Sequence, residues 1–568
     1  CAVLGAGPAW AQQLEEIIVT ATKRAESIQD VNISMNAFSG DDMLEFGWTD
    51  VTQVANQSPN LDIKYAWGNS MPIYTIRGVG MNSFQASDTP SVGLFIDEVF
   101  QTSIAQMGSQ LFDIERIEVL KGPQGALFGR NTNRGAVSYV TRRPSQEGDG
   151  FARVDFGNFG RVELEAAIGG GISDTVSGRL SVMSVRQGEG WVHDRTSGKD
   201  IGEVDITAVR GQLLFEPSDD LSVNVSVFAS RDRSQPVYFQ HIGFWDPASP
   251  GTLCAAYQQT RVPDPATCID VLGYSDTDGD PYAGDYSDRP DTPINSDTNL
   301  ENDQFGATIT VDKQFSNMDL TSITNVQSYD RYQPKESDGN PGLFVDFLFA
   351  SDIEAFSQEF RLTSTGDGNF SWIAGIVYAT DEISEDPPRI GYLDDYIGLR
   401  ARLVYTQERD SLAAYAQGEW LLSDRLRLTV GGRIIDEDLD FEKEVSFLFP
   451  PDFSVDSRLV LAVVPDENLQ VDGKLSSTEP TWRVALDYNL SEDVLVYGSV
   501  STGYKGGGFN GGLATNPRLS VPFDPEEVLA WEAGLKSTFA GGRARFNAAA
   551  FLYYYEGLQA ATPRVDEV

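Results

Sequence analysis

Cysteine, histidine and basic side chains are scarce in this chain of 568 residues. It has 3 Cys and 2 His, whereas a structural zinc site takes about four such ligands in paired spacing. The 42 Lys and Arg residues are outnumbered by 84 Asp and Glu, which gives a net charge of −42. A surface that follows nucleic-acid phosphates would have to form against this field. The composition therefore argues against a zinc protein and predicts no nucleic-acid partner.

Long apolar runs and catalytic motifs are also missing. No stretch approaches the roughly 18 consecutive apolar residues that a membrane-spanning helix needs. Gly506, Gly508 and Gly511 satisfy GxGxxG, but no helical periodicity follows, so this stretch is interpreted as an extracellular loop. The acidic run 276–280 hints at calcium but lacks the residue order of an EF-hand. We predict no enzyme activity, no cofactor and no metal site.

What the chain does have is the composition of an all-β protein. Its 54 Gly, 27 Pro and 11% aromatic residues favour short strands joined by turns over helices. From about residue 150, apolar and polar side chains alternate along one run after another. In one such run, Leu221, Val223, Val225 and Val227 share one face while Ser222, Asn224 and Ser226 share the other.

The connections between these runs differ in length in a regular order. Short ones are expected at 170–174, 216–220, 315–317, 366–369, 423–424, 491–492 and 540–543, and long ones at 188–204, 233–303, 331–350, 384–406, 439–477 and 506–525. Turns confined to one rim and loops to the other are typical of an outer-membrane barrel. We therefore predict a transmembrane antiparallel barrel over 150–568, with about fifteen strands of about ten to fourteen residues.

The two ends of the chain carry further expectations. Residues 1–11 end in Ala9-Trp10-Ala11, which has the form of a signal-peptidase site, so we interpret them as a signal-peptide remnant. A single-chain bacterial barrel takes an even number of strands, so about fifteen predicts an incomplete barrel that lacks its closing strands.

The longest predicted loop, 233–303, holds two groups of candidate residues. Cys254 and Cys268 lie in a polar, Pro-containing stretch, which suits a disulfide in an oxidising compartment; the alternative is two unpaired thiols. The aromatics that could contact a flat ligand at the barrel mouth are Phe244, Trp245, Tyr257, Tyr282 and Tyr286. The carboxylates of this loop would repel an anionic ferric complex unless a local Arg offsets them.

The first 150 residues carry the most specific motifs. They are the short β-prone run Glu16-Ile17-Ile18-Val19-Thr20-Ala21, then MPIYTIRG at 71–78, VGLFID at 92–97 and IERIEVLKGPQGALFGR at 114–130. Together with QEFRL at 358–362, GSVSTGYKGGGFN at 498–510 and WEAGLKS at 531–537, they closely resemble the TonB-dependent outer-membrane receptors. The stretch 131–138 departs from the family's pattern and is not used for a functional interpretation.

The resemblance implies a fold and a function. It implies a complete barrel of roughly 22 strands with an α+β plug domain at 31–145 inside the lumen, preceded at 12–30 by the TonB box and a linker. The TonB box would be Glu16 to Ala21, which binds TonB by strand addition. The implied partners are TonB with the inner-membrane ExbB–ExbD complex, outer-membrane lipid and the ligand, and the protein is expected to be a monomer in a Gram-negative outer membrane.

Basic plug residues in an acidic protein suggest how the plug is held. Arg77 and Arg130 belong to the plug motifs, whereas Glu359 and Glu532 fall on the lumen-facing parity of their strands. We hypothesise that these arginines pair with these glutamates, because charged contacts allow a plug to move more readily than an apolar core would. The alternative is local salt bridges within the plug.

The ligand stays open at this stage. The resemblance favours a ferric siderophore or another iron complex, with a carbohydrate or another nutrient second. Two readings from other classes are a passive porin, which would need no TonB box, and a secreted β-rich hydrolase, which would need a catalytic constellation.

Overall fold

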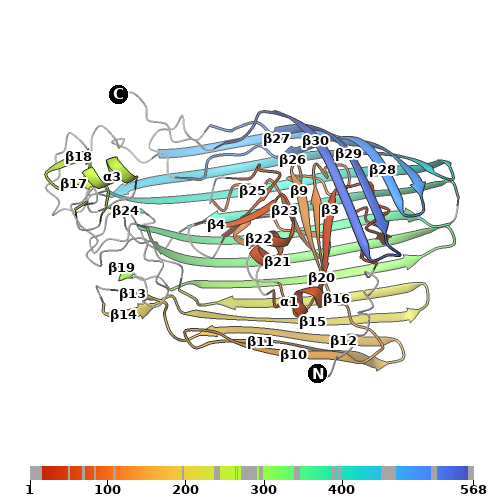
Figure 1. Cartoon of the computed structure of the whole chain (residues 1–568), viewed down its shortest axis with the longest axis horizontal. Coiled ribbons are helices and arrows are strands. Elements are labelled where there is room, and N and C mark those ends of the chain that lie inside the picture. The colour runs from red at the N-terminus through yellow and green to blue at the C-terminus, as the bar shows by residue number, and fades with distance from the viewer. Residues whose placement is uncertain are drawn as a thin grey trace, which may run out of the picture.

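The computed structural model describes residues 16–48, 51–66, 71–81, 85–106, 111–194, 197–235, 243–261, 264, 267–269, 291–292, 299–337, 346–366, 368–386, 392–394, 399–448, 469–512 and 521–560. A large antiparallel sheet curves around a small N-terminal domain, which we call the plug (Figure 1). The plug comprises helices α1 and α2 and strands β3 to β9.

The plug is built on a five-stranded mixed sheet with the order β3-β8-β9-β6-β7. Its second strand, β8, carries the IERIEVLK motif and pairs with β3 on one side and β9 on the other. A core of buried aliphatic and aromatic side chains, including Ile76, Ile117 and Tyr139, packs under the sheet. The plug strands are β3 (Met35–Ser39), β4 (Leu61–Ala66), β5 (Met71–Ile76), β6 (Gly93–Ile96), β7 (Val99–Phe100), β8 (Ile114–Lys121) and β9 (Gly135–Thr141).

Local sequence signals set the plug helices. Helix α1 (Gly40–Phe46) begins after Ser39, whose hydroxyl accepts from the Asp42 backbone N–H while the Asp42 carboxylate accepts from the Ser39 backbone N–H. It ends at Gly47, which has a φ of 66° in the left-handed region that glycine tolerates. Helix α2 (Val51–Gln57) and a 3₁₀ turn (Ile104–Gln106) complete the plug, whose α+β class matches the expectation.

The large sheet has fifteen strands in consecutive order among the described residues. They are β10 (Asp149–Phe156), β11 (Arg161–Ser173), β12 (Val176–Gln187), β15 (Val204–Ser218), β16 (Leu221–Asp232), β20 (Glu301–Gln314), β21 (Met318–Glu336), β22 (Asp346–Ser364), β23 (Phe370–Glu385), β25 (Leu399–Ser423), β26 (Leu426–Leu448), β27 (Leu469–Ser491), β28 (Val494–Lys505), β29 (Glu526–Phe539) and β30 (Ala544–Glu556). A short sixteenth strand, β24 (Tyr392–Asp394), pairs with β22 and β25. Within the described part of the chain, β10 and β30 each pair on one side only.

The two rims of the sheet differ as predicted. Tight turns such as 424–425 and 492–493 gather at the right-hand rim of Figure 1, whereas the small elements of the longer connections lie at the left-hand rim. These small elements are β13 (Val192–Asp194), β14 (Lys199–Ile201), β17 (Trp245–Asp246), β18 (Ser249–Leu253), β19 (Asp291–Thr292) and helix α3 (Ala255–Thr260). We refer to the left-hand rim as the extracellular rim.

Several strands extend beyond the predicted length. Strands β25, β26 and β27 have 25, 23 and 23 residues. The alternation of apolar and polar side chains stops before the pairing does: on β26, Ile434 is outward and apolar, whereas the next outward residues, Asp436 and Asp438, are acidic. Because the prediction relied on that alternation, it ended these strands too early.

Outward and inward faces of the sheet carry opposite chemistry. Outward Leu412 and Ile434 are more than half exposed, whereas inward Thr429 and Arg433 are buried against the plug side. Apolar side chains outside and polar ones inside are the arrangement of a transmembrane barrel. In the part of the chain described here, no helix is both long enough and apolar enough to cross a membrane.

Candidate functional site

The candidate TonB box forms a short strand that is partly folded into the plug. Strand β1 (Ile18–Val19) pairs antiparallel with β2 (Glu26–Ser27). Val19 and Ala21 are buried in an apolar cluster with plug residues, whereas Ile18 is 46% exposed. Glu16 is exposed and Ile17 is half-buried. The segment therefore presents alternate residues to the plug and to its surroundings.

Thr20 connects this segment to strand β8 of the plug. Its backbone N–H and its hydroxyl donate to one Glu118 carboxylate oxygen at 2.8 and 3.1 Å. Arg116 donates to the Thr20 hydroxyl at 3.1 Å and to Glu118 at 2.8 Å. Arg116 also pairs with Glu115, so this plug arginine makes local salt bridges, as the alternative reading of the plug charges expected.

Lys23 joins the same segment to the barrel wall. Its Nζ donates to both Glu359 carboxylate oxygens at 2.9 and 3.0 Å and lies 3.6 Å from the plug residue Glu98. Arg361 of β22 donates to Glu98 at 3.1 Å. Burial raises the pKa of the Glu98 carboxyl, but the charges of Arg361 and Lys23 lower it by more. The net shift of this pKa is therefore downward. Glu98 is therefore ionised and bridges plug and wall.

A second contact between plug and wall is made by Arg77. Arg77 donates to Glu532 of β29 at 2.7 Å and to the Tyr553 hydroxyl, and its guanidinium lies 3.9 Å from the centre of the Phe551 ring. Tyr497 also donates to Glu532, at 2.8 Å. Arg77 and Glu532 are thus brought together, as the sequence-based hypothesis proposed.

Arg130 has different partners from those hypothesised. Its guanidinium contacts Asp381 of β23 at 2.5 Å and Glu437 of β26 at 3.1 Å. Glu359, one of its two hypothesised partners, is engaged by Lys23 and Arg361, and Glu532, the other, by Arg77. That part of the hypothesis was wrong, because strand parity identifies which acids face the lumen but not which plug residue lies opposite each.

The motif glycines next to Arg130 have a steric reason. Gly129 has a φ of 88°, and a Cβ there would lie 2.8 Å from the Arg433 Cζ atom of β26. A side chain at this position would be strained and would also collide with the wall. The glycine allows the plug loop to approach the barrel closely.

Sequence reasoning set aside the stretch that follows, although it makes several contacts with the barrel. Arg134 pairs with Glu526 of β29 at 2.8 Å, and the Asn133 amide donates to the same carboxylate at 2.7 Å. The Asn131 side chain accepts from the Gly506 backbone N–H at 3.0 Å. The sequence signal that could have indicated these contacts was Arg134, a cation in an acidic protein. The Gly506–Gly512 stretch, interpreted from sequence as an extracellular loop, turns inward here, and its Phe509 stacks on Phe441 with 4.9 Å between ring centroids.

A cavity of about 80 Å³ separates plug and wall beside these contacts. Charged side chains from both sides line it together with apolar ones, and the charged residues are Lys23, Glu98, Arg130, Glu359 and Arg433. A cavity of this size has room for several water molecules, which its charged groups can bind. The interface between plug and barrel is therefore mixed: ion pairs lie beside a cavity, and small apolar clusters such as Leu127 with Ile373 and Tyr415 pack next to them.

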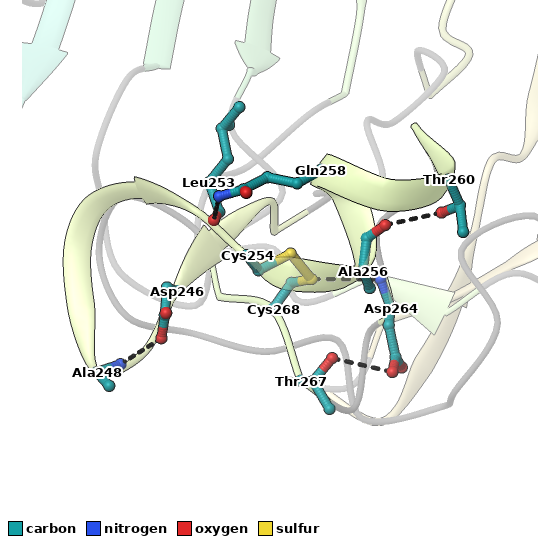
Figure 2. The surroundings of a disulfide bond; sticks show 10 residues. All are labelled: Asp246, Ala248, Leu253, Cys254, Ala256, Gln258, Thr260, Asp264, Thr267 and Cys268. Carbon is teal, nitrogen blue, oxygen red and sulfur yellow. Dashed lines mark hydrogen bonds between the residues drawn. A yellow bond between two sulfur atoms is a disulfide. The ribbon is translucent and has the colours of Figure 1, made fainter.

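The two candidate cysteines of the long loop lie in a small folded segment, and Figure 2 shows the disulfide between them. Cys254 and Cys268 form a disulfide across a sequence separation of 14 residues, and both are buried. Phe244 lies 5.0 Å from Trp245 and 5.8 Å from Tyr257 between ring centroids, with Phe244 38% exposed. The other two aromatic candidates, Tyr282 and Tyr286, and the acidic run 276–280 lie outside the described residues.

These features define a class of protein. It is an antiparallel membrane barrel whose lumen holds a plug domain, and hydrogen bonds and ion pairs join the plug to the wall. A strand-forming segment lies at the N-terminal end of the plug. Comparison with known families agrees. The family described as "TonB dependent receptor-like, beta-barrel" matches residues 256–567, and the "TonB-dependent Receptor Plug Domain" matches residues 27–136. The chain belongs to the TonB-dependent receptors, which are transport receptors of the Gram-negative outer membrane.

Individual relatives are distant in sequence. The pesticin receptor of Yersinia pestis is 23% identical over 535 residues, covering 92% of this chain and 68% of that protein. The ferripyoverdine receptor of Pseudomonas aeruginosa is 23% identical over 208 residues, covering 37% of this chain and 24% of that protein. Among solved structures, the ferric yersiniabactin uptake receptor of Yersinia pestis has a TM-score of 0.73 at 19% identity, covering 94% of this chain and 73% of that one.

Proposed function

We propose that this receptor imports a ferric siderophore across the outer membrane in a TonB-dependent cycle. The relatives named above are receptors for ferripyoverdine, for ferric yersiniabactin and for pesticin. A lumen filled by a plug does not admit a bulky chelate passively, so transport requires the plug to move.

The observation that carries the TonB-dependent part of the proposal is the geometry of β1. Ile17 accepts a backbone hydrogen bond from Ile28, so the pair of Ile17 and Ile28 is a hydrogen-bonded pair of this ladder. Such pairs alternate with positions whose backbone groups point away from the partner strand. Because Ile18 occupies the next position, its N–H and C=O face away from β2, where a TonB strand could add.

The contacts of Thr20 and Lys23 suggest how access to this edge is controlled. In the folded plug, the Thr20 N–H is occupied by Glu118, and Lys23 is held by Glu359 of the wall. A full six-residue pairing from Glu16 to Ala21 therefore requires these bonds to break. We propose that the state described here is the resting receptor, with the box only partly accessible.

Uptake of radioactive iron tests the proposal. Cells that produce the receptor and lack other iron receptors are supplied with iron as a catecholate, a hydroxamate or a citrate chelate, with and without functional TonB. Uptake of at least one chelate that disappears without TonB is expected. TonB-dependent growth on a carbohydrate with no uptake of any iron chelate would favour the alternative nutrient, and uptake without TonB would contradict energy coupling.

A further inference from the structure

The chain between the TonB box and the plug sheet is held by cations of the barrel wall. Three of these cations, on three different strands, donate to every second carbonyl from residue 28 to residue 32, at 2.6 to 2.7 Å. The pairs are Lys536 of β29 with Ile28, Arg427 of β26 with Asp30, and Arg483 of β27 with Asn32. We call residues 28–34 the wall-bound segment and these three cations the wall clamp.

Further bonds fix the same segment to the wall. The Asn32 side-chain amide donates to Asp487 of β27 at 2.9 Å, and Asp487 also accepts from Arg427 of the clamp at 2.8 Å. The Ser34 backbone N–H donates to Glu532 of β29 at 3.1 Å. The wall therefore bonds this segment from its first residue to the residue before β3.

The preceding stretch, 16–27, is attached to the wall in a different way. Its own side chains Lys23 and Arg24 reach acceptors on the wall. Such a contact ends when a single side chain swings away, because the main chain takes no part in it. The wall-bound segment is held through its main-chain carbonyls, so it cannot leave the clamp unless the chain itself moves. The kind of attachment thus changes between Ser27 and Ile28.

Hydrogen bonds rather than close packing hold this segment to the wall. A cavity of about 20 Å³, lined by Asn32 and Arg483 among others, lies between segment and wall, and it has room for about one water molecule. On the plug side, Val31 and Ile33 are buried in the apolar cluster that also contains Leu120. Departure of the box would remove its side chains from this cluster but would leave the bonds of the clamp in place.

We infer that the wall clamp ends the part of the chain that TonB draws out at Ser27, and that it protects β3 from being unravelled from its N-terminal end. The clamp cations are positioning residues, because they act on the chain and not on TonB or the ligand. Residues 16–27 extend over at most about 40 Å, at about 3.4 Å per residue, which sets how far the box reaches from the wall. A pull on the box then acts on the plug through the contacts of the box with β8.

This inference rests on the proposed TonB-dependent cycle, and its first test does not need TonB. Deuterium exchange of backbone amides is measured by mass spectrometry on purified receptor in detergent. In the double variant Lys536→Met/Arg483→Gln, which removes two of the three donors, amides at 28–34 should exchange about tenfold faster than in the wild type. Lys536→Arg/Arg483→Lys keeps a cationic donor at both positions and should keep exchange slow.

Two further variants complete this test. Arg425→Gln is the matched control, because Arg425 is exposed and precedes Arg427 by two residues; it should exchange like the wild type. Each variant is checked for heat-modifiable migration on gels, which reports a folded barrel. If the double variant does not fold, Arg427→Gln gives the same test at the more exposed end of the clamp, where the Arg427 side chain is 22% exposed.

The second test adds an excess of the periplasmic domain of TonB. In the wild type, exchange should change at 16–27 and stay unchanged at 28–34, whereas in the double variant the change should extend through 28–34 into β3. The inference is overturned if TonB speeds exchange at 28–34 of the wild type. It is also overturned if, without TonB, the clamp variant exchanges like the wild type or the conservative pair exchanges like the double variant. If the TonB domain changes nothing in the wild type, the proposed cycle is refuted, and the first test still decides whether the clamp holds the segment.

Discussion

Replacing Ile18 with proline tests whether β1 is the strand that TonB pairs with. Proline removes the backbone N–H at a position where that group points away from β2. The bond between Ile28 and Ile17 does not involve the Ile18 N–H. The substitution therefore affects the free edge and leaves the plug's own pairing in place, which is unusual for a proline in a strand.

The expected magnitude follows from the number of backbone bonds that strand addition offers. Alternate residues of the box, Glu16, Ile18 and Thr20, can pair with an added strand, but Thr20 can do so only after its backbone bonds to Glu118 and Lys23 break. Loss of the central donor removes about 1 kcal/mol of net hydrogen bonding, or about fivefold in Kd, before any clash of the proline ring is counted. We expect TonB binding at least fivefold weaker and energy-coupled uptake abolished.

The assay compares Ile18→Pro with Ile18→Ala, which keeps the N–H and shortens a side chain that is 46% exposed. Affinity for the periplasmic domain of TonB is measured by calorimetry with ligand present, and chelate binding and uptake are measured on the same variants. Chelate affinity should be unchanged in both. Normal uptake by cells that make Ile18→Pro in normal amounts would refute the assignment of the box.

Three further outcomes follow from other contacts. Lys23→Met removes both hydrogen bonds to Glu359. Backbone amides at 16–27 should then exchange with deuterium faster, as measured by mass spectrometry. Equal exchange rates would show that this contact does not restrain the segment. Cys254→Ser opens a disulfide that joins residues 14 apart, at a cost of about 3 kcal/mol, and should speed proteolysis within 243–269 while the barrel stays resistant. Burial and the charge of Arg77 lower the pKa of the Lys121 amine from 10.5 to about 8. Because the unfolded chain then binds the proton more tightly, plug stability against urea should rise between pH 8 and 10, and Lys121→Met should flatten that rise.

The sequence specified the architecture because barrel strands carry a local pattern. Alternating side chains marked the faces of β16 and β20 correctly, and Gly and Asp residues marked the short turns. The pattern became uninformative where both faces turned polar, as at Asp436 and Asp438, so strand lengths were underestimated there. The plug motifs were recognisable because their glycines are required sterically, as at Gly129.

Pairings between plug and wall were less predictable for a physical reason. Parity shows that Glu359, Asp381 and Glu532 all face the lumen, but a rotation of the plug by one strand exchanges their partners. No local pattern encodes that rotation. Arg77 pairs with Glu532, one of the two expected acids, whereas Arg130 pairs with Asp381 and Glu437.

The distribution of apolar and polar contacts indicates where movement of the plug is easiest. Val19 and Ala21 pack with Leu120 in the plug's own core, and Thr20 is bonded to Glu118 of β8. Displacing the box therefore disturbs β8 directly, and β8 leads into the Gly129 loop that touches the wall. Beyond that loop, ion pairs lie beside a cavity, and water can replace these pairs as they separate. Separation of an apolar interface of the same extent would expose apolar surface to water, and no hydrogen bonds from water would offset that free-energy cost. The boundary between plug and wall is thus easiest to separate at these ion pairs, so a pull on the box should shift that part of the plug along the wall before the barrel strands separate.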